Sequence, residues 1–388
     1  MVGLVRIVVF FAVALTILMG SHWLVYATTV RFLGLESQRV VLLCVLLALG
    51  MSFVVTALIS RVLANPVTDL LQWASSLWLG LVIYLIMALP IVWLVYGVSR
   101  AAGLSPDMRI VTGVLYGMAA ALTLYGAVNA LSPRVRKVDV RIEGLPDAWK
   151  GKTVVHLSDL HLGAIRGKGY LATVVRKVNA LEPEIILITG DLFDGMGGRL
   201  DSYAGLLDSL EANRGVYFAT GNHEGYLGLA GPLAALARTR IRVLDDEVVD
   251  LDGLQIVGIG FPEHDRPKDL HVKGDIDPDR PSILLFHTPT DVQESSKDRA
   301  DQQKRTYIAP ETTFTFARRH GIDLQLSGHT HQGQFWPFTA IARAIFNGYD
   351  YGLHTDGGFS IYVTSGAGTW GPPLRVGSSS EIAAIRLD

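Results

Sequence analysis

The stretch LSGHTHQGQFWPF, residues 326–338, places two histidines one residue apart between glycines and then runs into aromatic residues. Apolar residues precede the histidines, which therefore stand where a buried strand would end. Imidazole is a common ligand of metal ions in proteins. His329 and His331 are therefore candidate metal ligands, and a metal site would need further ligands from elsewhere in the chain.

Four other polar clusters also follow short apolar runs. They are SDLH (158–161), GDLFD (190–194), GNHE (221–224) and FHTP (286–289). The first three are spaced about 30 residues apart, the length of one strand–helix unit. Open α/β sheets bind their ligands at the carboxyl ends of the strands. One edge of the sheet is therefore expected to gather eight side chains: Asp159, His161, Asp191, Asn222, His223, His287, His329 and His331.

The pattern from residue 138 onward predicts an α/β domain with at least a partly parallel sheet. Strands are expected at residues 153–157, 184–188, 215–219, 255–259, 282–286, 323–326, 359–363 and 382–387. Helices are expected at residues 170–181, 202–212, 233–238 and 312–320. The polar segment 295–305 is expected to be a disordered surface loop, with a substrate lid as the alternative.

The eight candidate side chains are too many for one ion. They suit two ions that share one carboxylate and leave one residue for catalysis. Carboxylate, imidazole and amide oxygen, without thiolate, favour Mn, Fe, Zn or similar ions. Two ions about 3.5–4 Å apart stabilise the attacking and leaving oxygens in phosphoester hydrolysis and make hydroxide available near neutral pH.

Local geometry supports such a site. In extended backbone, alternate residues such as Asp159 and His161 point to the same side and can reach one ion. Glycines at positions 190, 221 and 328 would let the chain turn tightly at the strand ends. Each cluster alone has a simpler interpretation, because Asn222 could be a turn residue and His287 a core histidine. Five clusters in this order, each after a strand, are not explained by structure alone.

The order DxH, GDxxD, GNHE, H, GHTH resembles that of the calcineurin-like metallophosphoesterase superfamily, over most of residues 138–388. The resemblance implies a β-sandwich of two mixed sheets flanked by helices, with a dinuclear metal site at one edge. It implies one metal on Asp159, His161 and His331. It implies a second metal on Asn222, His287 and His329, and it makes Asp191 the bridge between the two.

The resemblance also implies roles beside the metals. His223 would contact the phosphate together with Asn222 and help the leaving group to depart, a role that suits an imidazole near neutral pH. Glu224 would orient His223. Asp194 would either support a metal ligand or cap its loop.

The tail YVTSGAGTWGPPLRVGSSSEIAAIRL, residues 362–387, resembles a bacterial membrane-associated branch of this superfamily, in which some relatives act on phospholipid-like or nucleotide-sugar lipid substrates. Arg375 in this tail is a candidate phosphate ligand, with an exposed structural arginine as the alternative. Gln332 departs from the glycine that close relatives usually carry, which puts the loop shape and the substrate fit in question.

The first third of the chain is nearly uncharged, with six arginines, no lysine and three acids in residues 1–132. Four apolar stretches, at about residues 7–26, 41–60, 71–97 and 111–131, contain no charged residue. Each is long enough to cross a bilayer, which takes about 20 helical residues. We therefore expect a transmembrane domain at residues 1–135 and the metallophosphoesterase domain at 136–388. Spans without acids or bases argue against a transporter or proton relay.

An even number of spans puts the amino terminus and the α/β domain on the same side of the membrane. The basic residues just after the last span, among them Arg134, Arg136 and Lys137, form the densest such cluster near a span. The positive-inside rule therefore predicts a cytoplasmic catalytic domain. The single cysteine, Cys44, excludes an intrachain disulfide.

We therefore expect an integral membrane, metal-dependent phosphoesterase that hydrolyses a phosphodiester, pyrophosphate or phosphomonoester, on a lipid-linked substrate at the bilayer. One alternative is a tethered enzyme for soluble nucleotides, and another is a non-catalytic membrane scaffold or sensor with the same fold. We expect no nucleic-acid partner, and the oligomeric state stays open. Phe335, Trp336 and Phe338 are expected either in the core or as a hydrophobic lip that meets acyl chains.

Overall fold

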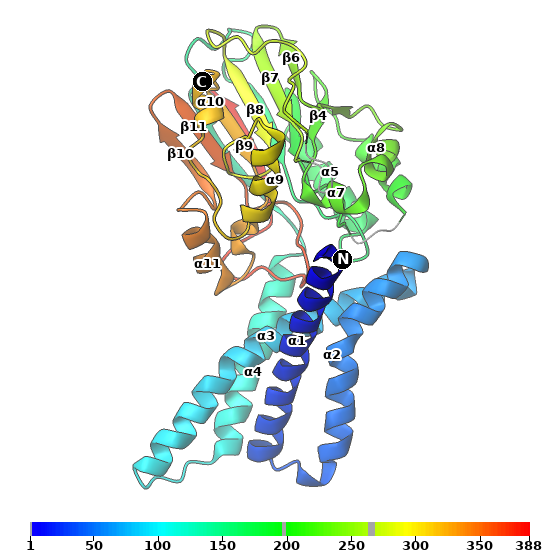
Figure 1. The fold of residues 1–388 in the computed structure, drawn as a ribbon, viewed down its shortest axis with the longest axis vertical. Coiled ribbons are helices and arrows are strands. Elements are labelled where there is room, and N and C mark those ends of the chain that lie inside the picture. The colour runs from blue at the N-terminus through cyan, green and yellow to red at the C-terminus, as the bar shows by residue number, and fades with distance from the viewer. Residues whose placement is uncertain (1, 196–198, 263–267) are drawn as a thin grey trace. The chain divides into compact units, whose positions relative to one another are not determined.

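The computed structural model describes residues 2–195, 199–262 and 268–388. The chain divides into two compact units (Figure 1). The helical unit comprises Met1–Val128 with Gly371–Leu374, and the α/β unit comprises Asn129–Trp370 with Arg375–Asp388. The two units are described separately below.

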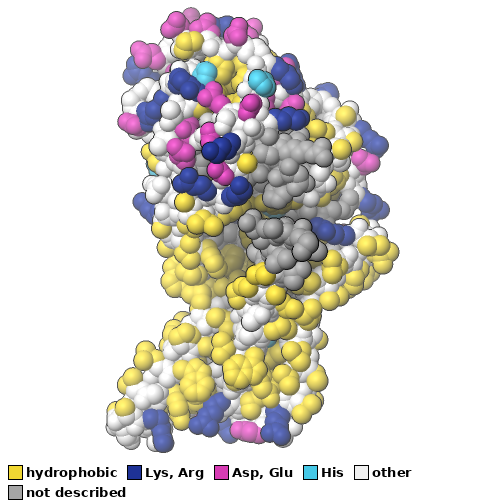
Figure 2. Space-filling view, in the orientation of Figure 1, with side chains coloured by type: hydrophobic (Ala, Val, Ile, Leu, Met, Phe, Trp, Pro, Cys, Tyr) yellow, Lys and Arg dark blue, Asp and Glu magenta, His cyan; other side chains and the backbone are white. Residues whose placement is uncertain are grey.

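The helical unit contains four long helices: α1 Val2–Leu33, α2 Arg39–Val62, α3 Pro66–Ala101 and α4 Met108–Asn129. Within the described part of the chain, all four are long and apolar enough to cross a membrane. Hydrophobic side chains cover most of their visible surface, with a few charged side chains at one end, whereas the α/β unit carries many charged side chains (Figure 2). The four predicted spans are confirmed as helices, and most of them extend beyond the apolar stretches that predicted them.

Capping explains where the longest of these helices begins. The Asn65 side chain accepts hydrogen bonds from the backbone N–H groups of Val67 and Thr68, at 2.9 and 3.1 Å. Pro66 follows at the first helical position, where its missing N–H costs nothing. A short 3-10 turn, η1 Glu36–Gln38, precedes α2.

The α/β unit is built on two six-stranded sheets. The first sheet has the order β1-β12-β2-β3-β4-β5, with β1 Arg134–Val140, β2 Thr153–Leu157, β3 Ile185–Thr189, β4 Val216–Ala219, β5 Arg242–Val243 and β12 Glu381–Leu387. The second has the order β10-β11-β9-β8-β7-β6, with β6 Glu247–Leu251, β7 Leu254–Ile259, β8 Ser282–Phe286, β9 Leu324–Ser327, β10 Gly352–Asp356 and β11 Phe359–Val363.

Both sheets are mixed. In the first, β12 runs antiparallel to β2, and in the second β6 and β10 run antiparallel to their neighbours. The two sheets share one core, in which Val154 and Leu187 of the first sheet meet Ile256 and Leu285 of the second. This is the sandwich that the resemblance implied. The simpler prediction of one open sheet was wrong. The strands of both sheets are short apolar runs, so the sequence pattern does not show to which sheet a strand belongs.

Several helices pack on the outer faces of the sandwich. They are α5 Lys168–Asn179, α6 Ala204–Leu207 and α8 Ala230–Leu236, with the 3-10 turn η2 Leu200–Tyr203, on the first sheet and α10 Thr315–Arg319 on the second. The other helices are α7 Asn222–Leu227, α9 Ser296–Arg305 and α11 Phe338–Ile345, with the 3-10 turn η3 His331–Gly333. The disordered loop predicted at 295–305 was wrong, because Ser295 caps α9 by accepting a hydrogen bond from the Asp298 backbone N–H. The predicted helix at 202–212 is only a 3-10 turn followed by the short α6.

Candidate metal centre

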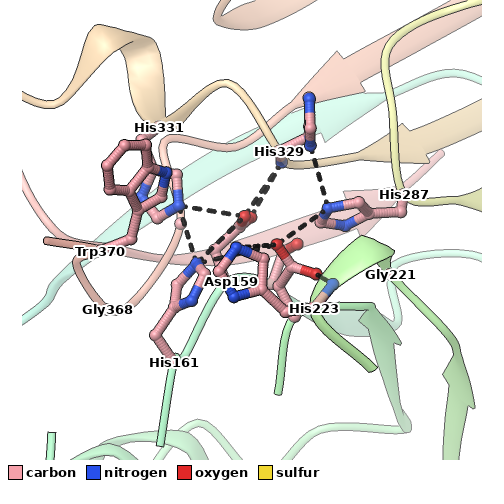
Figure 3. Close-up of polar contacts among 12 residues, drawn as sticks. Asp159, His161, Gly221, His223, His287, His329, His331, Gly368 and Trp370 are labelled. Atoms are coloured by element: carbon pink, nitrogen blue, oxygen red, sulfur yellow. Dashed lines mark hydrogen bonds and ion pairs between the residues drawn. The ribbon is translucent and has the colours of Figure 1, made fainter. Parts of the chain in front are cut away.

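The predicted ligands meet where β2, β3, β8 and β9 end and α7 begins (Figure 3). All seven are buried: Asp159, His161, Asp191, Asn222, His287, His329 and His331. Polar side chains leave water only when other polar groups or ions replace it, so this concentration of possible ligands fits a cation site.

One group of possible ligands consists of Asp159, His161 and His331. One donor atom from each lies within 4.8 Å of the others. The Nε2 atoms of His161 and His331 are 3.0 Å apart, and His331 Nε2 lies 3.2 Å from the Asp159 carboxylate (Figure 3). These are three of the four residues that the resemblance assigned to the first metal, and the fourth is the bridging Asp191.

A second group consists of Asp191, His287 and His329. The Asn222 side-chain oxygen joins it, at 3.0 Å from both His287 Nε2 and His329 Nδ1. Asp191 lies between the two groups, because its Oδ2 atom is 3.2 Å from His287 Nε2 and 3.8 Å from His161 Nε2. This is the position that a bridging carboxylate would need.

The second group fits a cation for a reason of charge. His287 Nδ1 lies 2.7 Å from the Thr189 carbonyl, so Nδ1 carries a proton and Nε2 of the neutral ring presents a lone pair. That lone pair faces oxygens of Asp191 and Asn222. The nitrogen and oxygen lone pairs repel each other unless a proton or a metal ion lies between them. Burial lowers the pKa of His287, but the Asp191 carboxylate outweighs it and raises the pKa to about 9. The arrangement therefore needs a positive charge, which either a proton on His287 or a divalent ion in its place would supply.

Backbone geometry aims the ligands. Five of them adopt positive φ angles between 48° and 69°: Asp159, His161, Asp191, His329 and His331. Non-glycine residues rarely adopt this left-handed region, and such outliers cluster at functional sites. The prediction that the Asp159/His161 pair lies on extended backbone was therefore wrong. The strands end before the ligands, and a left-handed backbone conformation directs these five side chains.

Glycines allow the strand ends to approach closely. A Cβ atom on Gly190, whose φ is +76°, would lie 2.5 Å from the Gly221 backbone and 2.7 Å from His287 Nδ1. At Gly221, whose φ is −104°, a Cβ would instead collide with the Asp191 carboxylate. Glycine is therefore needed at position 190 both for its positive φ angle and because a side chain would not fit. At position 221 glycine is needed only because a side chain would not fit.

His223 lies outside both groups, although with His161 and Asp194 it forms a third set of possible ligand atoms within 4.8 Å of one another. Its Nδ1 atom donates to the Asp194 carbonyl at 2.6 Å, which leaves Nε2 directed to the site, 3.9 Å from Asp191 Oδ2. Burial lowers the pKa of His223, but the Asp191 and Asp194 carboxylates raise it above its ordinary value. A protonated imidazole beside the site can neutralise developing negative charge.

Glu224 makes its contacts elsewhere. Its carboxylate accepts hydrogen bonds from the backbone N–H groups of Asp191 (3.0 Å), Leu192 (2.9 Å), Phe193 (3.2 Å) and Gly221 (2.8 Å). Glu224 therefore holds the loop that carries Asp191. The group that orients His223 directly is the Asp194 carbonyl, which residue types could not reveal.

Arg375 is fully buried, and its guanidinium donates to the carbonyls of His331 (2.8 Å), Ser365 (2.7 Å) and Gly368 (2.7 Å). These contacts favour the structural alternative over phosphate binding, although the arginine is buried rather than exposed. Gln332 has a φ of +54°, a conformation that glycine adopts without strain. A glutamine in place of the glycine that the resemblance implied therefore costs local backbone energy.

Two tyrosines near the ligands were not predicted. The Tyr307 hydroxyl accepts from the Asn222 side-chain amide at 3.1 Å and lies 3.2 Å from the Tyr226 hydroxyl. The Tyr307 ring centroid is 5.0 Å from that of His329, and the Tyr226 ring centroid is 5.1 Å from that of His223. Tyr307 follows a polar segment without a recognisable motif, so nothing in its neighbourhood in the sequence signals this position.

The aromatic residues after the histidines divide between core and surface. Phe335 is buried, whereas Trp336 and Phe338 are 53% and 40% exposed. Ile341, one helical turn further along α11, is also exposed. We call Trp336, Phe338 and Ile341 the aromatic edge. The core interpretation therefore holds for Phe335 alone.

Comparison with known proteins supports the family that the motifs resembled. The family described as Calcineurin-like phosphoesterase matches residues 152–333. A zebrafish (Danio rerio) transmembrane protein with metallophosphoesterase domain is 34% identical over 69% of this chain and 60% of its own length. An uncharacterized metallophosphoesterase of Campylobacter jejuni is 34% identical over 68% of this chain and 66% of its own.

An uncharacterized metallophosphoesterase of Helicobacter pylori is 31% identical over 74% of this chain and 72% of its own length. The chain thus spans slightly less than two thirds of the first two relatives and more of the third. The ordered motifs, the two-sheet fold and these similarities agree, and the chain belongs to the calcineurin-like phosphoesterase family.

Proposed function

We propose that this protein is a membrane-anchored phosphoesterase that uses two divalent metal ions to hydrolyse a phosphoester or pyrophosphate of a lipid-linked substrate. The observation that carries the proposal is the Asp191 carboxylate, which lies between two groups of buried ligands with His223 beside it. When bound, the ions would neutralise phosphate charge and make hydroxide available near neutral pH.

The chain's own residues then have distinct tasks. The first ion would be held by Asp159, His161 and His331, and the second by Asn222, His287 and His329. Asp191 would bridge them. His223 would contact the phosphate and give a proton to the leaving oxygen from Nε2, while the Asp194 carbonyl holds the ring by Nδ1.

The lipid assignment rests on two features. Four helices able to cross a membrane keep the catalytic unit near a bilayer, and the first relative is likewise described as a transmembrane protein. The aromatic edge exposes large apolar side chains close in sequence to His331, which suits contact with acyl chains. Basic residues after the last span further support a cytoplasmic catalytic unit.

The experiment is to identify lipids that co-purify with the full-length protein by mass spectrometry and then to measure their turnover with Mn²⁺, Fe²⁺ or Zn²⁺. We expect a phosphorylated lipid to be hydrolysed in mixed micelles with a rate that depends on its surface concentration. Equal or faster turnover of soluble nucleotides, independent of micelles, would favour the tethered nucleotide enzyme instead. No turnover of any phosphoester with any of these metals would favour the scaffold or sensor.

A further inference from the structure

A cavity of about 660 Å³ lies beside the metal centre within the α/β unit. Pockets for small molecules typically measure roughly 300–1,000 Å³. Thr220 and Phe261 line the cavity. Thr220 comes two residues before Asn222, and the Phe261 ring centroid lies 6.3 Å from that of His287. The cavity therefore adjoins the side of the metal centre that carries Asn222 and His287.

One wall of this cavity is apolar. Leu229 and Leu233 lie one helical turn apart and are only half-buried, and Leu236 and Val243 continue the same wall. Apolar side chains that line a cavity remain accessible to an apolar ligand. Much of the remaining lining is charged or polar, with Lys268, Asp269, His271 and Lys273 among it. The apolar surface is therefore a strip along one side, against which a flexible hydrocarbon chain could lie.

A polar group on α9 faces the same cavity. Arg299 is 6% exposed, and its Nε atom has no hydrogen-bond partner among the described residues. The guanidinium also donates to the Gly260 carbonyl, at 3.4 Å. A buried donor without an acceptor is costly, so the Nε–H group is available to an oxygen atom of a ligand or of a water molecule. Asp245 and Asp246 also line the cavity and their charges act on this guanidinium. An uncharged acceptor, such as an ester carbonyl, therefore suffices.

We propose that this cavity binds the acyl chain of a phosphorylated lipid, with the chain along Leu229 and Leu233 and an ester oxygen at Arg299, while the phosphate reaches the metal centre. The inference rests on the proposed function, since it assumes that the phosphate binds at the metals. It adds a recognition site for the part of the substrate that does not react.

The test measures binding rather than turnover of a lipid. The full-length protein in nanodiscs, loaded with Mn²⁺, is titrated with glycerol 3-phosphate and with 1-octanoyl-glycerol 3-phosphate. We expect the octanoyl ester to bind at least about tenfold more tightly, as burial of only two methylene groups would produce. Leu233→Gln and Leu229→Gln should each remove most of this preference.

The control is Ala234→Gln, an exposed neighbour on the same helix that does not line the cavity. Hydrolysis of bis(p-nitrophenyl) phosphate by all variants is followed in parallel and reports folding of the metal centre. A preference that survives both leucine variants, or that Ala234→Gln removes equally, would overturn the acyl site. Absence of aryl phosphodiester turnover in the unmodified protein would instead count against the proposed function, and the binding ratio would still decide the cavity.

Discussion

The metal centre and the aromatic edge lie close together in sequence but differ in what they bury. In the first, polar ligands such as Asp159 and His331 are withdrawn from water. In the second, Trp336 and Phe338 remain exposed. Buried ligands gain from a cation between them, and exposed apolar side chains gain from an apolar partner. Under the proposed function a cation would bind the first region and a lipid the second, so the two should respond to different variants and substrates.

The largest effect is expected for Asp191→Asn, which keeps the size of the side chain and removes the shared charge. Turnover of bis(p-nitrophenyl) phosphate should fall by about 10³-fold, the scale of losing a central electrostatic group. Asp201→Asn, which changes an exposed carboxylate paired with Arg238, serves as the matched control and should leave the rate unchanged. Retained turnover by Asp191→Asn would contradict the bridging role.

His223→Gln should separate catalysis from metal binding. Loss of the general acid is expected to lower kcat by about 10²–10⁴-fold, because the leaving oxygen no longer receives a proton in the transition state. Metal content, measured by atomic emission, should stay at the level of the unmodified protein. Loss of a metal ion in this variant would instead make His223 a ligand.

Glu224→Gln tests how the Asp191 loop is held. The amide keeps only one acceptor oxygen for the four backbone N–H groups that the carboxylate satisfies. Metal affinity should weaken by about 10–100-fold, as for other groups that orient ligands. Excess Mn²⁺ should restore most of the activity. If excess metal leaves the loss of activity unchanged, Glu224 would instead act by orienting His223.

Trp336→Ser should give the smallest and most selective effect. Turnover of a lipid substrate in mixed micelles is expected to fall by about tenfold, from loss of one large apolar contact. Turnover of bis(p-nitrophenyl) phosphate should not change. Leu353→Ser, at an exposed apolar residue of β10, is the control. Equal losses on both substrates would mean that Trp336 supports the fold rather than lipid contact.

The residue motifs predicted which side chains lie together better than they predicted the fold around them. Ligand identity is carried by residue type and order, so the motifs alone were enough to bring Asp159 and His329 to one edge. The sandwich could not be derived in this way, because Val154 and Ile256 read as the same kind of strand although they belong to facing sheets. Only the resemblance to a known family distinguished the two-sheet sandwich from a single open sheet.

Other features of the site depend on backbone atoms or distant segments. The carbonyl that holds His223 belongs to Asp194, and every residue has a carbonyl. The left-handed turns at Asp159 and His161 follow from tertiary contacts that override local preference. Tyr307 reaches Asn222 from 85 residues away, through a segment whose polar composition indicated only a loop.

The central claim is that two metal ions share Asp191, and counting bound ions against activity tests it most directly. The full-length protein is stripped with a chelator and titrated with Mn²⁺, while bound metal and bis(p-nitrophenyl) phosphate turnover are measured on the same samples. We predict two ions per chain at saturation, with full activity only when the second ion is bound. Full activity with a single ion, or in the chelated protein, would contradict the account.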